Sequence, residues 1–176
     1  MELLAPAGSR QALTAAVQSG ADAVYLGGPQ FGARYSAENF TIEEMKTWVD
    51  YCHLYGVDVH VTVNTLVKEK EIESLKEYLK QLNKIGVDAL IVQDMGAVEI
   101  IKKTVPDMTL HASTQMTVTS LEGVKYLENM GFSRVVLARE LSEKEIEHIC
   151  KNAKAEIEVF VHGAICMCYS GQCLMS

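Results

Sequence analysis

The stretch GADAVYLG at residues 20–27 decides the fold, because the same pattern of a glycine and an apolar run recurs in GVDVHVTV at residues 56–63 and in GVDALIVQ at residues 86–93. In each copy a glycine follows an amphipathic run and leads into a short apolar run. Glycine suits the left-handed position that ends a helix, and a short apolar run is typical of a buried strand. The copies therefore predict one helix–strand unit that is used repeatedly.

The same alternation extends along the whole chain. Apolar runs predict seven strands, at residues 2–5, 23–26, 58–63, 89–93, 109–112, 134–138 and 157–161. Apolar residues three and four positions apart predict six helices, at residues 10–19, 42–55, 70–85, 97–104, 121–130 and 143–152. Capping boxes are expected at three helix starts, in the pairs Thr41 with Glu44, Thr119 with Glu122 and Ser142 with Glu145. Strands that alternate with helices indicate a parallel sheet with right-handed crossovers.

Two architectures satisfy this alternation: a doubly wound open sheet and a (β/α) TIM-type barrel. The segment LAPAGS at residues 4–9 has one glycine, which disfavours a dinucleotide site of the GxGxxG kind. Seven strands and six helices in series favour an incomplete (β/α) barrel, since a full barrel has eight of each. We expect residues 1–176 to form a single barrel-type domain, the N-terminal part of a longer protein or one that a partner chain or a second copy completes.

Composition narrows the function classes. The 176 residues are 48% hydrophobic, which is enough for a real core. A formal net charge of −7 counts against a self-sufficient nucleic-acid binder, so an RNA partner would need a local basic patch or another part of a longer protein. No apolar run of membrane-spanning length and no signal-peptide pattern is present, so we expect a cytoplasmic protein. The five cysteines are then expected to be free thiols or ligands.

Polar residues lie at the carboxyl ends of the predicted strands, which is where barrel enzymes have their catalytic residues. The candidate catalytic residues are His111, Gln115, Arg139, Glu140 and His162. The candidate substrate-binding residues are Tyr25, Gly27, Arg34, Asn64, Gln93 and Asp94. The arginines offer a fork for a carboxylate or phosphate, the acids a general base, and the histidines a ligand or proton carrier. The alternative for each residue is that it caps a loop or bonds a backbone group.

Three cysteines follow the seventh predicted strand within eight positions: Cys166, Cys168 and Cys173. The spacing CxCxxxxC supplies soft thiolates for a metal ion or an iron–sulfur cluster, each of which usually takes four ligands. His162 or a residue beyond Ser176 would supply the fourth. Thiol catalysis by Cys166 with His162 and three inert packed thiols are the alternatives. The sequence has no GxSxG elbow and no HExxH helix.

The end of the chain resembles the signature of the collagenase-like peptidase family, a group of peptidases of unassigned mechanism. That pattern, E-x-F-x-x-G-[SA]-aliphatic-C-x(4)-G-x-C-x-aliphatic-S, is filled here by Glu158, Phe160, Gly163, Ala164, Ile165, Cys166, Gly171, Cys173, Met175 and Ser176. The segments ELLAPAGS, GADAVYLGG, FGAR, ENF, HASTQM and VVLAREL also look like that family. The resemblance covers essentially the whole chain.

The resemblance implies a barrel-like domain and two competing activities. One is a collagen-degrading endopeptidase that would act through a metal or a thiol. The other is oxygen-independent hydroxylation of a tRNA uridine, an rRNA cytidine or the ubiquinone ring, with a [4Fe–4S] cluster and with prephenate as the hydroxyl source. Cys166 and Cys173 match cluster-ligand positions of the family, whereas Cys168 lies outside the pattern. The missing hydrolytic motifs favour an iron–sulfur-dependent component of prephenate-dependent tRNA hydroxylation, and a non-catalytic scaffold completed by a partner is the third hypothesis.

Overall fold

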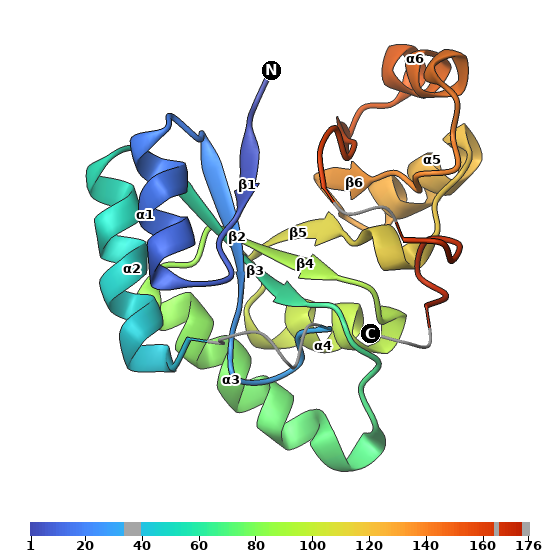
Figure 1. Ribbon diagram of the computed structural model, residues 1–176. Coiled ribbons are helices and arrows are strands. Elements are labelled where there is room, and N and C mark those ends of the chain that lie inside the picture. The colour runs from blue at the N-terminus through green and yellow to red at the C-terminus, as the bar shows by residue number, and fades with distance from the viewer. Residues whose placement is uncertain (34–39, 164–165, 174–176) are drawn as a thin grey trace. The chain divides into compact units, whose positions relative to one another are not determined.

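The structure is a computed structural model that describes residues 1–33, 40–163 and 166–173. It divides into two compact units, Met1–Met108 and Thr109–Ser176. Strands and helices alternate along the described chain as the sequence predicts, with seven strands and six α-helices (Figure 1). The expectation of one barrel-type domain that belongs to a longer protein stays a prediction.

The first unit holds a parallel sheet of four strands, β1 (Leu4–Pro6), β2 (Ala23–Gly27), β3 (Asp58–Val63) and β4 (Ala89–Val92). The strands lie in chain order. Four helices follow them, α1 (Arg10–Gln18), α2 (Ile42–Leu54), α3 (Ile72–Ile85) and α4 (Met95–Thr104), and a 3₁₀ turn, η1 (Glu69–Glu71), precedes α3. This turn is why the third helix begins two residues later than predicted.

The core of the first unit is aliphatic. Val59, Val61 and Val63 of β3 are fully buried, as are Leu75 and Leu79 of α3. Burying a side chain of this kind contributes about 1.5–3 kcal/mol relative to leaving it exposed. The apolar periodicities that predicted the helices and strands therefore mark the side chains that hold this unit together.

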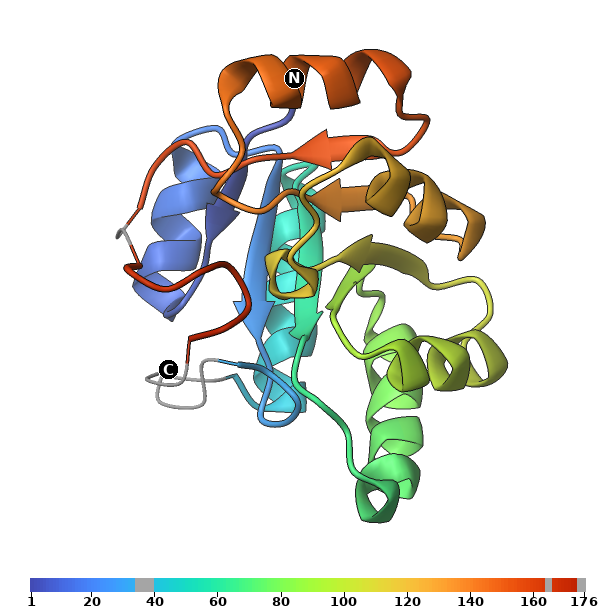
Figure 2. The same cartoon turned by 90° about the vertical axis from the view of Figure 1, so that its right-hand side faces the viewer.

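The second unit holds β5 (Thr109–Ala112), β6 (Arg134–Val136) and β7 (Glu156–Glu158), again parallel and in chain order (Figure 2). A 3₁₀ turn, η2 (Thr114–Met116), follows β5, and the helices α5 (Leu121–Asn129) and α6 (Glu143–Asn152) connect the strands. The last two strands are shorter than predicted. Phe160 and Val161, expected in the seventh strand, are exposed and lie beyond its end.

The helix starts test the capping predictions. The boxes of Thr41 with Glu44 and of Ser142 with Glu145 are confirmed. The pairing of Thr119 with Glu122 is wrong, because Ser120 caps α5 and its hydroxyl accepts the N–H of Gly123 at 3.2 Å. In the described chain, no helix has both the length and the apolarity that crossing a membrane requires.

Candidate functional site

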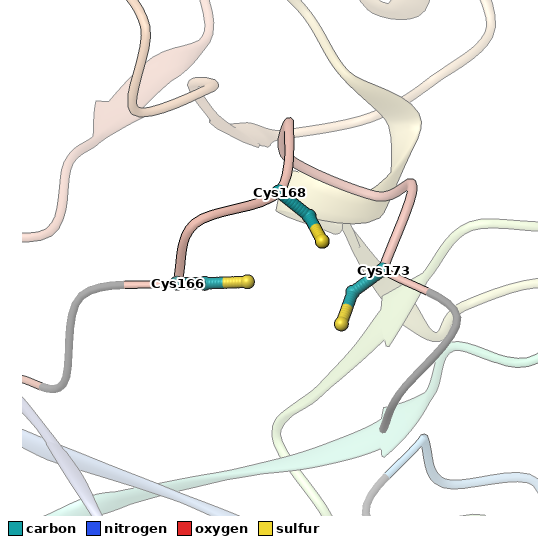
Figure 3. A group of neighbouring side chains, drawn as sticks. All are labelled: Cys166, Cys168 and Cys173. Atoms are coloured by element: carbon teal, nitrogen blue, oxygen red, sulfur yellow. The ribbon is translucent and has the colours of Figure 1, made fainter.

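The thiols predicted as ligands come together in the loop that follows β7. The Sγ atoms of Cys166, Cys168 and Cys173 all lie within 4.8 Å of one another. Figure 3 shows the three sulfur atoms directed toward a shared space. Cys166 is exposed, the other two are half-buried, and all three are free thiols. Solvent and ions therefore have access to the three thiols.

The spacing of the sulfurs suits a thiolate-bound metal. An ion that binds thiolates at about 2.3 Å in a tetrahedron places its sulfur ligands about 3.8 Å apart. Separations below 4.8 Å approach that value. In the described part of the chain, the group that is close enough to share an ion consists of these three thiols. His162, expected as a fourth ligand, is exposed and lies outside that group.

Crowding changes the acidity of the central thiol. The hydrogen bond with Cys173, and then the charge of that thiol, raise the pKa of Cys168 above its ordinary value. Like charges this close disfavour three free thiolates. A bound cation removes the penalty, since metal coordination deprotonates a thiol outright. The loop is therefore better suited to holding a cation than to holding three uncompensated charges.

Arg139 and Glu140, predicted as catalytic, lie in the turn after β6 and contact the backbone of the thiol loop. The Arg139 guanidinium donates to the carbonyl oxygen of Cys166 at 3.1 Å and to that of Cys168 at 3.0 Å. A Glu140 carboxylate oxygen accepts the N–H of Ser170 at 2.9 Å. Desolvation raises the pKa of Glu140 and the Ser170 hydrogen bonds lower it, and the result lies below its ordinary value.

Sequence reasoning missed Ser170 and Thr117, which complete this network. Ser170 is 2% exposed, and its hydroxyl accepts both the backbone N–H of Arg139 at 3.1 Å and the Nε–H at 3.3 Å. The Thr117 hydroxyl donates to the Ser170 carbonyl at 2.7 Å. Contacts that span 31 and 53 positions leave no signal in a single sequence.

Two predicted catalytic residues of the second unit lie on β5 and just after it. Gln115 belongs to η2, and its carbonyl carbon and oxygen lie so near Gly171 that a side chain there would overlap them. His111 is 4% exposed, within β5 and in register with Arg134. Arg134 is itself buried and ion-paired with Glu156 at 2.5 Å. The catalytic roles of His111 and Gln115 stay predictions.

The substrate-binding candidates all belong to the first unit. Asp94 caps α4, with one oxygen accepting the N–H of Ala97 at 3.0 Å and the other that of Val67 at 2.9 Å. Asn64 accepts the N–H of Ala33 at 3.0 Å. Both side chains make loop-capping contacts of the kind that the alternative describes, and their substrate-binding roles stay predictions. The remaining described candidates are half-buried in or just after strands: Tyr25, Gly27 and Gln93. Arg34 lies outside the described residues.

A pocket of about 790 Å³ in the first unit lies elsewhere, between α2 and α3. Thr41 and Lys46 line it on one side, and Glu77 and Gln81 line it on the other. None of the described substrate-binding candidates belongs to its lining. The strand-end residues and this pocket are therefore separate features.

Comparisons with known proteins agree with the arrangement of the fold. Over 90% of its length the chain is similar in structure to the U32 peptidase Mk0906, with a TM-score of 0.72, 21% sequence identity and coverage of 68% of that chain. At this identity the likeness concerns the fold alone. Together with the alternation of parallel strands and helices, it confirms the incomplete barrel that the sequence predicts.

Two curated relatives are more similar in sequence. The chain is 44% identical over 176 residues to the 23S rRNA 5-hydroxycytidine C2501 synthase of Escherichia coli (strain K12) and covers 26% of it. It is 41% identical over 175 residues to tRNA hydroxylation protein P1 of Bacillus subtilis (strain 168) and covers 42% of it. The chain thus spans less than half the length of these relatives. Because the model of peptidase family U32 matches residues 8–176, the chain belongs to that family.

Proposed function

We propose that this chain is the thiol-bearing, barrel-type part of an RNA-hydroxylating protein, with an iron–sulfur cluster held by Cys166, Cys168 and Cys173. The proposal rests on three thiols in one loop, the ligand type that an iron–sulfur cluster takes, in a chain similar to proteins named for rRNA and tRNA hydroxylation. The finer proposal is a tRNA uridine as the target. Prephenate is then the co-substrate and source of the hydroxyl group, and the protein is cytoplasmic.

The residues of this chain would serve the cluster in separate ways. The thiols supply three ligands, and the remainder of a full-length protein supplies the fourth. When bound, such a cluster supplies one-electron chemistry. The half-buried Cys168 and Cys173 keep the site partly shielded, while the exposed Cys166 leaves it open to a substrate. Because the net charge of this chain is −7, other parts of a longer protein would make most of the contacts to the phosphates of tRNA or rRNA.

Anaerobic reconstitution tests the cluster. The full-length protein, incubated with iron and sulfide under reducing conditions, is expected to turn brown and to show thiolate-to-iron absorption in the visible range. Cys166→Ala and Cys173→Ala should each lose most of that absorption. Cys150→Ala is the matched control, because Cys150 is an exposed thiol on α6 that lies outside the three-thiol group. Colour that survives both ligand substitutions would refute the assignment.

RNA analysis tests the activity. The full-length gene would be expressed in cells that lack their own tRNA and rRNA hydroxylation proteins, and nucleosides from both RNAs would be measured by mass spectrometry. We expect a hydroxylated pyrimidine to appear with the wild-type protein and to be absent with Cys173→Ala. Supplying or withholding prephenate in the anaerobic reaction in vitro tests the co-substrate. A protein that binds a cluster but leaves every nucleoside unchanged would contradict RNA hydroxylation.

The second candidate function is an endopeptidase, which the name of the peptidase family supports. It would act through a metal at the three thiols or through a nucleophilic thiol. Within the described residues no hydrogen bond joins His162 to the free thiol of Cys166, and thiol catalysis by this pair stays a prediction. Cleavage of gelatin by colourless protein, with loss of cleavage in Cys166→Ala, would favour this candidate over hydroxylation. Colourless, inactive protein that associates with itself or with a partner chain would favour a scaffold.

A further inference from the structure

The turn after β6 presents one side chain to three positions of the thiol loop. The Arg139 guanidinium donates to the carbonyl oxygens of Cys166 and Cys168, and its Nε–H donates to the Ser170 hydroxyl at 3.3 Å. The backbone N–H of the same residue also donates to that hydroxyl, at 3.1 Å. Arg139 thus holds both ends of the Cys166–Cys168 segment and the residue that leads toward Cys173.

The geometry requires a planar fork. Two carbonyl oxygens and one hydroxyl, each on a different residue, accept hydrogen bonds from three different nitrogens of one guanidinium. An arginine presents five N–H groups in a fixed plane, whereas a lysine is a compact point charge on a flexible stem. A lysine at this position would keep the positive charge and lose the simultaneous contacts. The charge and the geometry of Arg139 can therefore be separated by experiment.

The far end of the loop has two further hydrogen bonds that do not involve the guanidinium. Ser170 donates its N–H to Glu140 at 2.9 Å and accepts at its carbonyl from Thr117 at 2.7 Å. Ser170 is 2% exposed, so this anchor is buried while the thiols beside it remain accessible. The loop is therefore held by hydrogen bonds at two places, at the buried Ser170 and at the carbonyls of Cys166 and Cys168, which the Arg139 guanidinium contacts.

From this arrangement we propose that Arg139 is the positioning residue of the thiol site. By fixing the carbonyls of Cys166 and Cys168, it directs their Sγ atoms toward the space that the Cys173 sulfur also faces (Figure 3). Its charge of +1 also offsets the net −1 of three thiolates around a divalent ion. The inference rests on the proposed function only in that these thiols bind metal, and it assigns Arg139 to the protein loop instead of to a substrate carboxylate or phosphate.

Titration with Co²⁺ tests the proposal, because thiolate-bound Co²⁺ has a visible spectrum that reports both affinity and geometry. The chain would be kept reduced and free of oxygen. Outer partners of metal ligands are typically worth about 10–100-fold in metal affinity. We expect Arg139→Gln and Arg139→Lys each to weaken Co²⁺ binding by at least about tenfold and to change the d–d bands at saturation. Ser170→Ala should fall between these variants and the wild type, because it leaves both carbonyl contacts in place.

Arg10→Gln is the matched control, since Arg10 is an exposed arginine of α1 whose guanidinium is bonded to Glu44. It should bind Co²⁺ as the wild type does. Thermal unfolding with a chelator present shows whether each variant folds, and if Arg139→Gln does not, Arg139→Lys and Ser170→Ala decide the outcome. Wild-type affinity and bands in Arg139→Lys would overturn the positioning role while leaving the metal site intact. A wild-type chain that gives no thiolate–Co²⁺ spectrum would refute the metal site and the positioning role together.

Discussion

Substituting alanine for Gly171 tests whether the thiol loop depends on a close backbone approach. Gly171 has φ +76°, and a Cβ there would lie 2.4 Å from the carbonyl oxygen of Gln115 and 2.8 Å from the Thr117 hydroxyl. The left-handed backbone costs a residue with a side chain about 1–2 kcal/mol. Relieving the overlap requires a shift of about 1 Å, and overpacking of this kind costs about 1–3 kcal/mol. The substitution thus costs about 2–5 kcal/mol if the loop stays in place.

The loop is expected to move instead of bearing that strain, because it is outside the sheet and held by a few side-chain hydrogen bonds. Its displacement would break the 2.7 Å contact between Thr117 and Ser170 and would shift Cys173, two residues further along. We therefore expect Gly171→Ala to weaken Co²⁺ binding by about 10–100-fold. The melting temperature should fall by less than a loss of about 2–5 kcal/mol would produce, because the displaced loop no longer bears the strain.

Gly56→Ala is the matched control. Gly56 has φ +69° but open space where a Cβ would lie, so it carries the backbone cost without the overlap. That variant should lose about 1–2 kcal/mol of unfolding free energy in urea and keep its Co²⁺ affinity. A Gly171→Ala protein that matches the wild type in both affinity and melting temperature would refute the close approach at Gln115.

Three further predictions concern stability, measured by urea or thermal unfolding. Thr41→Ala removes the capping hydroxyl of α2 and should cost about 1 kcal/mol, and an unchanged midpoint would contradict the capping box. Tyr78→Phe should be neutral or stabilising by up to about 1 kcal/mol, because the buried Tyr78 hydroxyl has no hydrogen-bond partner among the described residues, and a clear loss would reveal a partner. The pKa of Glu128 lies below its ordinary value of 4.5, because hydrogen bonds from the backbone N–H of Ala155 and then of Lys154 outweigh the opposing desolvation. The stabilisation that the Glu128 carboxylate provides is therefore fully present above pH 4.5 and is lost as the pH falls through the folded-state pKa. Glu128→Gln should therefore be less stable than the wild type at pH 7 and converge with it in acid, and a pH-independent difference would count against this account.

The alternation of strands and helices could be predicted from the sequence because it is set by local periodicity. Strand β3 and helix α6 have the predicted ends, since an apolar run or a capping pair marks them within a few residues. A single side chain decided where the prediction failed. Asp94 started α4 two residues earlier than expected by accepting the N–H of Ala97. The start of α5 at residue 121 was predicted, but its cap is Ser120 and not Thr119.

The thiol site was also predictable, for a related reason. Cysteines within eight positions are held near one another by the chain itself, whatever the rest of the fold does. The contacts of Arg139, by contrast, could not be predicted from the sequence. A guanidinium at a strand end suggests a substrate clamp, and only coordinates show that its donors meet the carbonyls of Cys166 and Cys168.

The contacts of the thiol loop explain why the parallel sheet matters for its chemistry. Thr117 and Gln115 follow β5, Arg139 and Glu140 follow β6, and the loop itself follows β7. Parallel strands bring these three connections to the same end of the sheet, which is where barrel folds build their sites. The position of the sulfurs is thus fixed by strand pairing as much as by the loop sequence. Without coordinates, the cysteine spacing indicates which ligands are available, and the pairing of β5, β6 and β7 determines what holds them in place.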